Sequence, residues 1–338
     1  MTKLKFITLS LLILALFPAC LIFGSVDIPA IQVVKALFGM EVETEVWRLI
    51  VVESRLPMAL TAIFSGASLS VAGLLLQTAF NNPLAGPSIL GISTGSSLGV
   101  AIVMLALGGA VSAFGATYYM AIVGGALIGA LAVMLLLLIF STIVKSTAML
   151  LIVGILVGYL TSSAISLLNF FATQEGVHSF MIWGLGNFSG VTMDKMPVFC
   201  MIAIPSLIGA ILLIKPLNAL LLGNRYAESM GLNITYTRNL ILLISGLLTA
   251  VVTAFCGPIG FLGLVVPHIA RMVMGTSNNS VIVPATMLCG AAIGLLCALL
   301  SILPSRTEVL PLNAITPIIG VPIIIYIIIE RKRLHYFN

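Results

Sequence analysis

The stretch Gly257-Pro-Ile-Gly-Phe-Leu-Gly-Leu-Val-Val-Pro-His-Ile-Ala-Arg271 decides what kind of protein this chain forms. It is apolar enough for the hydrocarbon interior of a membrane, yet three glycines and two prolines interrupt it as they would a poor helix. Non-helical backbone at membrane depth is tolerated only where protein buries it or where it lines a cavity, because an unsatisfied peptide group in lipid costs several kcal/mol. We therefore expect a short, irregular span that shapes the wall of an internal path, not a simple anchor.

Composition places the whole chain in the membrane. Of its 338 residues, 60% are hydrophobic and 7% are charged, whereas soluble domains carry about 25% charged residues. Since a span needs about 20 apolar residues, the length predicts an all-α polytopic membrane protein with about ten transmembrane helices in a single domain over residues 1–338. Lys3 and Lys5 before the first apolar run imitate a signal peptide, but we expect a retained helix. The predicted spans are residues 4–24, 57–79, 91–110, 118–142, 147–171, 196–214, 239–256, 259–273, 281–303 and 312–329.

Charged residues divide unevenly between the two sets of connections that alternate along this pattern. With the N-terminus inside, ten of the fifteen basic residues fall in inner loops and eight of the ten acidic residues fall in outer loops. Cytoplasmic loops carry an excess of Lys and Arg, so the pattern places both termini in the cytoplasm. Residues 27–55 and 172–195 then form large outer loops, and 215–238 forms an inner connection. This topology explains the net charge of +5, which gives no support for nucleic-acid binding.

The inner connection 215–238 has the character of a docking element. Leucines between Leu217 and Leu222 are followed by Gly223 and then by Ala227–Leu232, a pattern that predicts two short helices separated by glycine. A short amphipathic helix pair at the membrane surface suits binding in a groove of a partner. A plain surface loop that covers helix ends is the alternative.

Charged residues are absent from the predicted spans except at their ends. A charge at the bilayer centre costs at least about 2.5 kcal/mol and is usually kept for function, so a proton-coupled transporter is disfavoured. An ion-coupled secondary transporter of a large solute, with Asn, Ser and backbone carbonyls as sodium ligands, stays open as the alternative. The chain also lacks a GxxxxGK[ST] phosphate loop. If the protein pumps a solute, another polypeptide supplies the energy.

Enzyme-like and metal-binding patterns have simpler explanations. Gly91-Ile-Ser-Thr-Gly95 satisfies the GxSxG pattern of serine hydrolases, but a small-residue face that allows close helix packing explains it better. His268 ends an apolar run, and we expect it to cap or hydrogen-bond backbone, not to bind a metal. We expect no catalytic residue, no metal site and no cofactor. The cysteines lack ligand spacing and resemble small hydrophobic residues: Cys20, Cys200, Cys256, Cys289 and Cys297.

A series of motifs occurs in order along the whole chain. They are Arg55-Leu-Pro57, Asn82-Pro-Leu-Ala85 with Gly91 beyond it, Thr147 leading into Leu150-Leu-Ile-Val-Gly154, Trp183-Gly184, Ala227-Glu-Ser-Met-Gly-Leu232, Gly257 to Arg271, and Leu310-Pro311 to Pro322. Together they closely resemble the FecCD-type permeases of ABC importers for iron-siderophores, haem and vitamin B12. Several ordered motifs make this resemblance far more specific than any one of them.

The resemblance implies a type II ABC importer permease fold with ten helices in one subunit. Two such subunits, as a homodimer or with a similar paralogue, would enclose the translocation path for a metal chelate. Two ATPase subunits would attach on the cytoplasmic face, and a periplasmic or lipid-anchored substrate-binding protein would dock outside. The setting is the bacterial plasma (inner) membrane, with lipid around a multi-pass bundle. Which chelate is carried stays open.

The family's functional positions can be placed on this chain residue by residue. By similarity, Arg55 matches an outer arginine that pairs with a glutamate of the binding protein. The family has a second arginine three residues later, and this chain has Met58 at that position. Arg306 lies near the position of another docking arginine in the family's pattern. Measured from Pro311, however, it is displaced from that position by about one helical turn. The cytoplasmic gates are Asn82, Leu84, Ser146 and Thr147. The segment that couples to the ATPase consists of Ala227, Glu228, Ser229, Met230, Gly231 and Leu232.

Overall fold

The computed structural model describes residues 2–106, 116–144, 146–302 and 309–335, and these parts contain helices and their connections without any strand. Two π-helical segments, Ile50–Arg55 (η1) and Ile102–Ala106 (η2), continue α-helices. The α-helices are α1 (Thr2–Ile22), α2 (Ala30–Leu37), α3 (Glu45–Leu49), α4 (Leu56–Ala79), α5 (Ile92–Ala101), α7 (Ala116–Ile143), α8 (Thr147–Phe171), α9 (Gln174–Gly184), α10 (Met196–Leu212), α11 (Ile214–Leu221), α12 (Asn224–Ser229), α13 (Ile234–Cys256), α14 (Leu262–Met274), α15 (Asn279–Ile302) and α16 (Leu312–His335).

Each predicted span corresponds to a helix or a helix pair. Among the described residues, six helices are long and apolar enough to cross a membrane, and α10 with α11 adds a seventh as a pair bent by 49°. Three shorter apolar helices, Ile92–Ala106, Leu262–Met274 and Leu312–Tyr326, occupy the third, eighth and tenth predicted spans. The prediction of an all-α polytopic membrane protein is confirmed.

Local sequence explains where α13 begins and ends. The side chain of Asn233 accepts a hydrogen bond from the Tyr236 N–H at 3.0 Å, as an N-cap does for an otherwise unpaired donor. The helix ends at Cys256, where Gly257 takes a φ of +79°. Glycine reaches this region without a Cβ penalty, so the chain can leave the helix there and start the irregular run.

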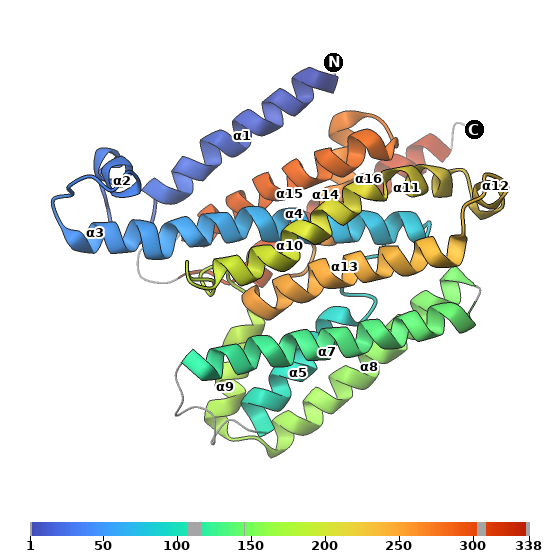
Figure 1. Ribbon diagram of the computed structural model, residues 1–338, viewed down its shortest axis with the longest axis horizontal. Helices are drawn as coiled ribbons and strands as arrows, with labels where there is room; N and C mark the ends of the chain where they lie inside the picture. Colours follow the sequence, from blue (N-terminus) through green and yellow to red (C-terminus); the bar gives the residue numbers. More distant parts are fainter. Residues whose placement is uncertain (1, 107–115, 145, 303–308, 336–338) are drawn as a thin grey trace.

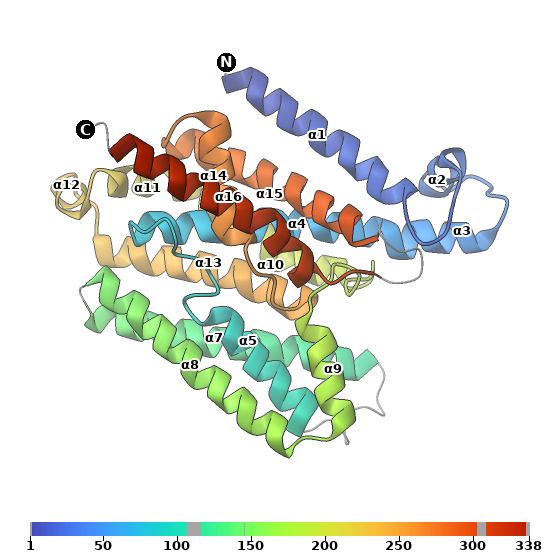
Figure 2. The same cartoon turned by 180° about the vertical axis from the view of Figure 1, so that it is seen from behind.

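Helix α4 is the central element of the bundle. It packs against α13, α14 and α15, while α5, α7 and α8 form a group on the far side of α13 (Figures 1 and 2). The most apolar part of Glu45–Ala79 is 83% buried, whereas that of α8 is only 17% buried. Helix α8 therefore presents most of its apolar surface to lipid or to another chain.

Close helix crossings in the bundle use glycine. A Cβ on Gly66 of α4 would lie 2.1 Å from the carbonyl oxygen of Gly290 on α15, and a Cβ on Gly99 of α5 would lie 1.9 Å from that of Gly125 on α7. In lipid the hydrophobic effect does not drive helices together, so helix association depends on van der Waals packing. Small residues allow the two backbones to approach closely and increase that packing. The small-residue face predicted around the GxSxG pattern is confirmed, because Gly95 also packs against α7, beside Gly129.

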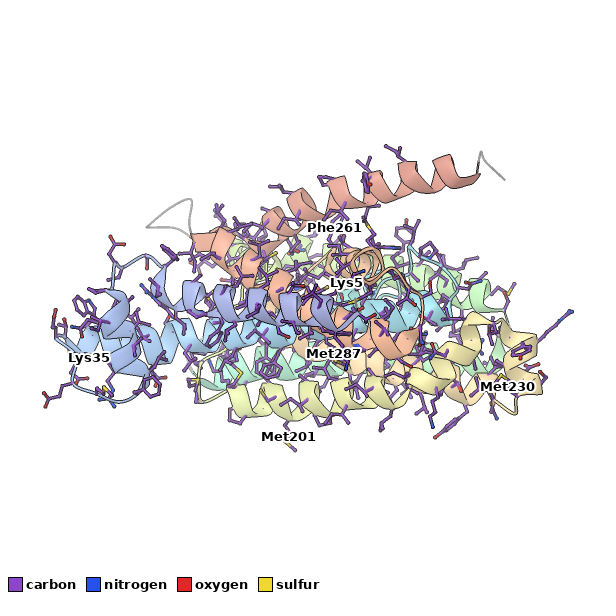
Figure 3. The ribbon with its side chains drawn as sticks, turned by 90° about the horizontal axis from the view of Figure 1, so that it is seen from above. Lys5, Lys35, Met201, Met230, Phe261 and Met287 are labelled. Carbon is purple, nitrogen blue, oxygen red and sulfur yellow. The ribbon has the colours of Figure 1, made fainter. Side chains whose placement is uncertain are left out.

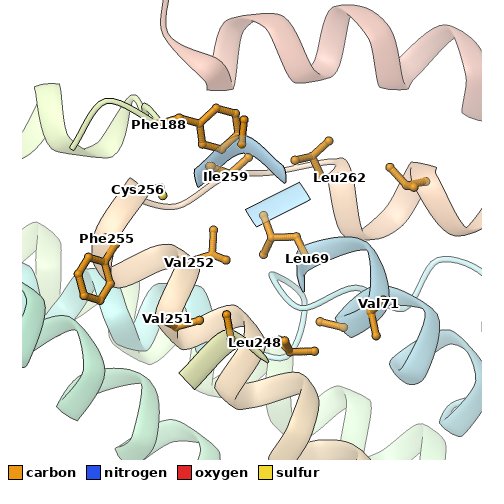
Figure 4. Packing of buried hydrophobic residues seen from close by; sticks show 14 of the residues in the cluster. Leu69, Val71, Phe188, Leu248, Val251, Val252, Phe255, Cys256, Ile259 and Leu262 are labelled. Carbon is orange, nitrogen blue, oxygen red and sulfur yellow. The ribbon is translucent and has the colours of Figure 1, made fainter. Parts of the chain in front are cut away.

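Apolar side chains fill the space between the crossings. Leu69 of α4 and Val252 of α13 lie just below the break that follows Cys256 (Figure 4). Interdigitated packing of this kind fixes the relative positions of α4 and α13. The break is thereby held over a rigid pair of helices.

The connections gather at two ends of the bundle. We call them the α12 end, which also carries the loop between α4 and α5 and the turn between α14 and α15, and the α3 end, which also carries α2 and α9 (Figure 1). Lys35 on α2 and Met230 after α12 mark these opposite ends (Figure 3). Of the loops that the structure describes, those predicted on the same side of the membrane therefore lie at the same end of the bundle.

Candidate functional site

The irregular run is a break between α13 and α14 at the α3 end. Residues 257–261 are not helical, and Phe261 has a φ of +66°. The Asn187 N–H donates to the Cys256 carbonyl at 3.0 Å, and the Gly260 N–H donates to the Asn313 Oδ1 at 3.1 Å. Other segments of the chain thus supply hydrogen-bond partners for this broken backbone, and its place in the wall of an internal path stays a prediction.

Asn313, near the start of α16, joins three segments of the chain. Its Nδ2 donates to the carbonyl oxygens of Pro258 and of Gly184, the latter at 2.9 Å. Its backbone N–H donates to the Leu185 carbonyl at 3.2 Å. The side chain thus ties the end of α9 and the break to α16. Asn313 lies within the motif Leu310-Pro311 to Pro322, but the sequence shows it only as a lone amide at the start of an apolar span and does not indicate these partners.

The predicted gate loop follows α4 at the α12 end. The Asn82 Oδ1 accepts from the Leu84 N–H at 2.9 Å, which holds a tight turn, and the Leu84 side chain is 49% exposed. The His268 Nε2 lies 2.9 Å from the Pro83 carbonyl oxygen, and because a carbonyl only accepts, Nε2 carries the proton. The prediction that His268 hydrogen-bonds backbone is confirmed.

The second pair of predicted gate residues begins α8. Ser146 is the N-cap of this helix, and its hydroxyl accepts from the Met149 N–H at 3.4 Å. Thr147 is the first helical residue. The far end of the gate loop also reaches α8, since a Cβ on Gly91 would lie 3.0 Å from the Gly154 carbonyl oxygen. The loop therefore spans from α14 to α8 and contacts both helices.

Arg55 does not lie on an accessible surface. It is 4% exposed, and its Nη1 donates to the carbonyls of Leu21 at 2.9 Å and Ile22 at 2.8 Å, while its Nη2 donates to the Val26 carbonyl. A cation at a helix C-terminus satisfies unpaired carbonyls and interacts favourably with the helix dipole. The guanidinium is thus enclosed by the end of α1, and the docking role assigned to Arg55 by similarity stays a prediction. The other predicted docking residue, Arg306, lies outside the described residues.

Arg238 has a similar role at the opposite end. It is 7% exposed, its Nε donates to the Ser141 hydroxyl at 2.9 Å, and its Nη2 donates to the Val144 carbonyl at 3.2 Å. Because these acceptors lie at the C-terminus of α7, the guanidinium again satisfies unpaired groups and interacts favourably with the helix dipole. A buried arginine therefore caps one helix at each end of the bundle.

We expect Arg55→Met to destabilise the protein. The apolar replacement leaves the α1 carbonyls without their donor, and a buried polar group without a partner costs about 1–3 kcal/mol. Thermal unfolding in detergent should show a lower midpoint for this variant, whereas Arg48→Met, which removes an exposed arginine of α3, should match the wild type. Equal midpoints for the two variants would contradict the capping role.

The predicted coupling segment forms two short helices, as expected. Gly223 has a φ of +96° and separates α11 from α12. Helix α12 ends in a Schellman motif, in which the Leu232 N–H donates to the Ala227 carbonyl at 3.0 Å and the Gly231 N–H donates to the Glu228 carbonyl at 2.9 Å. Gly231 has the required left-handed conformation, with a φ of +84°.

The surface of α12 is an exposed protrusion with apolar side chains. Met230 and Leu222 are each 63% exposed, and Tyr226 is 54% exposed. Glu228 and Ser229 are exposed beside them, while Ala227 is fully buried and anchors the helix. Apolar groups at the tip of a protruding helix are typical of a surface that binds a partner.

A bundle with this many membrane-crossing segments, a break between α13 and α14 at one end and a protruding helix pair at the other end has the architecture of a multi-pass transport permease. The model of the FecCD transport family matches residues 11–330. The chain belongs to this family, whose members are transport permease subunits.

Curated relatives and a solved structure agree with this assignment. The vitamin B12 import system permease protein BtuC of Salmonella paratyphi A is 34% identical over 292 residues, which cover 86% of this chain and 85% of the relative. BtuC of Klebsiella pneumoniae subsp. pneumoniae is 32% identical over 294 residues, with 84% of each chain covered. A solved structure, described as an inward-facing conformation of an ABC transporter assigned to the metal-chelate type, superimposes with a TM-score of 0.84 at 28% identity. The superposition covers 98% of this chain and 100% of the chain in the solved structure.

Proposed function

We propose that this protein is the membrane-spanning subunit of a type II ABC importer that moves a metal chelate into the cytoplasm, driven by separate ATPase subunits. The observation that carries the proposal is the exposed, glycine-bounded helix α12 on a permease chain that has no phosphate loop of its own. A protein built in this way needs a partner to supply energy, and α12 is the element that protrudes toward one. Family membership and the names of the relatives support the substrate class, an iron-siderophore, haem or a cobalamin.

The charge distribution supports an orientation of the chain in the membrane. Basic residues are concentrated in the loops of the α12 end, so the positive-inside rule puts this end, together with both termini, in the cytoplasm. The ATPase subunits bind α12 there, and the residues at Asn82, Leu84, Ser146 and Thr147 close the path on that side. The substrate-binding protein docks at the α3 end, formed by the outer loops 27–55 and 172–195, with Arg306 as a candidate contact.

A second permease subunit completes the path. The side of α8 that is not covered in this chain carries large apolar side chains, among them Leu156 at 60% and Tyr159 at 71% exposure. A path between two copies is lined by small, hydroxyl and apolar groups, which bind a bulky chelate weakly enough to release it. Specificity then resides mainly in the binding protein.

The experiment that tests the proposal is reconstitution in proteoliposomes. Purified permease is combined with the ATPase subunits and the binding protein encoded beside it, and uptake of cyanocobalamin, a ferric hydroxamate and haem is measured with and without ATP. We expect uptake of one chelate class only when ATP, ATPase and binding protein are all present. Uptake by the permease alone under a sodium or proton gradient would support a secondary transporter instead.

Substitution of Gly231 tests the role of α12. Gly231→Val forces a β-branched residue into a left-handed conformation, at a cost of about 1–2 kcal/mol, and should displace the end of α12 from its ATPase groove. We expect uptake to fall at least about tenfold, which corresponds to about 1.4 kcal/mol of lost coupling, while the permease stays folded.

Gly39→Val is the matched control for this variant. Gly39 has a φ of +70° and no neighbour within 4 Å of its Cβ position, but it lies after α2 at the α3 end. It carries the same backbone strain far from α12. Because Gly39 lies in the outer loop 27–55, which is proposed to dock the binding protein, the two variants are also compared in ATP hydrolysis by the permease–ATPase complex without binding protein. Equal hydrolysis by the two variants would remove the coupling assignment.

A further inference from the structure

Asn218 on α11 clamps the turn between α14 and α15. Its Oδ1 accepts from the Asn279 N–H at 2.8 Å, and its Nδ2 donates to the Asn278 Oδ1 at 3.1 Å and lies 3.4 Å from the Ser280 hydroxyl. One side chain thereby holds the first residues of α15 and the end of the turn. Since α11 leads directly into α12, a displacement of α12 reaches this turn through Asn218.

The same turn is the C-terminal end of α14. Helix α14 ends at Met274, and Gly275, with a φ of +68°, donates its N–H to the Arg271 carbonyl at 2.8 Å. The Asn278 side chain closes the turn by accepting from the Ser280 N–H at 2.9 Å. Because the turn is short and internally hydrogen-bonded, it moves together with the end of α14.

Helix α14 in turn holds the end of α4 and the loop that follows it. The Arg271 Nη1 donates to the Gln77 Oε1 at 2.8 Å, and the Gln77 Nε2 returns a hydrogen bond to the Leu264 carbonyl at 3.1 Å. The His268 Nε2 donates to the Pro83 carbonyl at 2.9 Å. His268 and Arg271 are three residues apart and share one face of α14. That face is bonded both to α4 and to the loop that carries Asn82 and Leu84.

We propose that Asn218, Arg271 and His268 are positioning residues that transmit the movement of α12 through α14 to the gate loop 80–91. The proposal rests on the proposed function, which supplies the ATPase that moves α12 and the gate that the loop forms. Coupling between two sites is carried by an element that has two discrete arrangements, such as a rigid helix held by directional hydrogen bonds. The hydrogen bonds join segments that lie 60 to 194 residues apart in sequence, so they connect elements that have no covalent reason to move together.

Accessibility of a cysteine at position 84 reports the state of the gate loop. Leu84 is half exposed, and the native cysteines, of which Cys200 is the most exposed, are first replaced by alanine. Leu84→Cys is introduced in the reconstituted complex, and its modification by a charged maleimide is followed with and without ATP and vanadate. The wild-type background should show a change of modification rate on nucleotide trapping.

Asn218→Ala and His268→Leu should each abolish most of this nucleotide-dependent change while ATP hydrolysis is kept, measured at a temperature below the unfolding midpoint of each variant, because loss of a buried hydrogen bond lowers that midpoint. His268→Gln should restore it, because the glutamine amide offers an N–H donor at a similar reach. Asn239→Ala is the matched control, since Asn239 is a half-buried asparagine near the α12 end that bonds Ser141 outside this route. Its response should equal that of the wild type.

The double variant decides whether the residues act in series. If Asn218→Ala and His268→Leu lie on one route, the double variant loses no more of the response than either single variant, whereas independent effects add. A wild-type response that survives in both single variants, or losses that add in the double variant, overturns the transmission route and leaves the proposed function intact. A wild-type complex without any nucleotide response overturns the gate assignment itself and the route with it.

Discussion

Gly73→Ala should disrupt the packing of the bundle more than any other single methyl addition. A Cβ at this position of α4 would lie 1.6 Å from the carbonyl oxygen and 2.7 Å from the Cα of Gly263 on α14. These are backbone atoms, so no flexible side chain can move aside, and the two helices have to separate. Overpacking costs about 1–3 kcal/mol and occasionally more, and for a chain of this length we expect the midpoint of thermal unfolding to fall by roughly 1–4 °C.

The separation should also affect transport. Gln77 lies one turn beyond Gly73 on α4 and bonds both Leu264 and Arg271 of α14, so a shift of α14 removes these contacts as well. Uptake should therefore fall in the fraction of protein that remains folded. Size-exclusion chromatography, thermal unfolding and uptake of the purified variant measure the three effects.

Gly124→Ala is the control for the added methyl group. Gly124 is also a helical glycine, on α7, but nothing lies within 4 Å of its Cβ position. Alanine stabilises a helix by about 1 kcal/mol relative to glycine, so this variant should equal or exceed the wild type in stability. If Gly73→Ala and Gly124→Ala unfold at the same temperature, α4 and α14 are not in backbone contact.

Asn313→Leu should be the most damaging substitution at the α3 end. Leucine is similar in size but leaves the Gly260 N–H and the carbonyls of Gly184 and Pro258 without their side-chain partner. Each unsatisfied buried group costs about 1–3 kcal/mol, but these groups are partly buried at the α3 end, so water can replace part of the lost bonds. We expect a loss of about 1–3 kcal/mol of stability and faster hydrogen exchange in the break.

The readout for Asn313→Leu combines thermal unfolding with hydrogen exchange of residues 184–187 and 256–261. Asn187→Leu is the control, because Asn187 is an exposed asparagine in the same region whose side chain accepts only locally, from the Gly190 N–H at 3.0 Å. It should retain protection in the break, where its backbone N–H still bonds Cys256. Unchanged exchange in Asn313→Leu would show that the break is held by packing alone.

Most of the fold could be predicted because span formation is a local property. A run of about 20 apolar residues forms a helix in a membrane whatever the rest of the chain does, and glycines such as Gly223 and Gly257 end helices through their own φ angles. The short eighth span and the helix pair of the coupling segment were predictable for the same reason.

The partners of polar side chains could not be predicted. Arg55 was assigned to docking of the binding protein by similarity alone, whereas the acceptors of its guanidinium in the structure, the Leu21 and Ile22 carbonyls, lie 34 and 33 residues earlier in the chain. Nothing local distinguishes an arginine that ends in solvent from one that caps another helix. The burial of Arg55 depends on where α1 packs.

The sequence by itself determined the membrane class, the positions of the helices and the family, since hydropathy, glycine placement and ordered motifs are properties of short segments. Only the tertiary structure decided that Asn313 holds the broken span and that Asn218, Arg271 and His268 link α11, α14 and the gate loop. The physical reason is that hydrogen bonds are short and directional. A bond between residues up to 194 positions apart exists only once helix packing has brought donor and acceptor together.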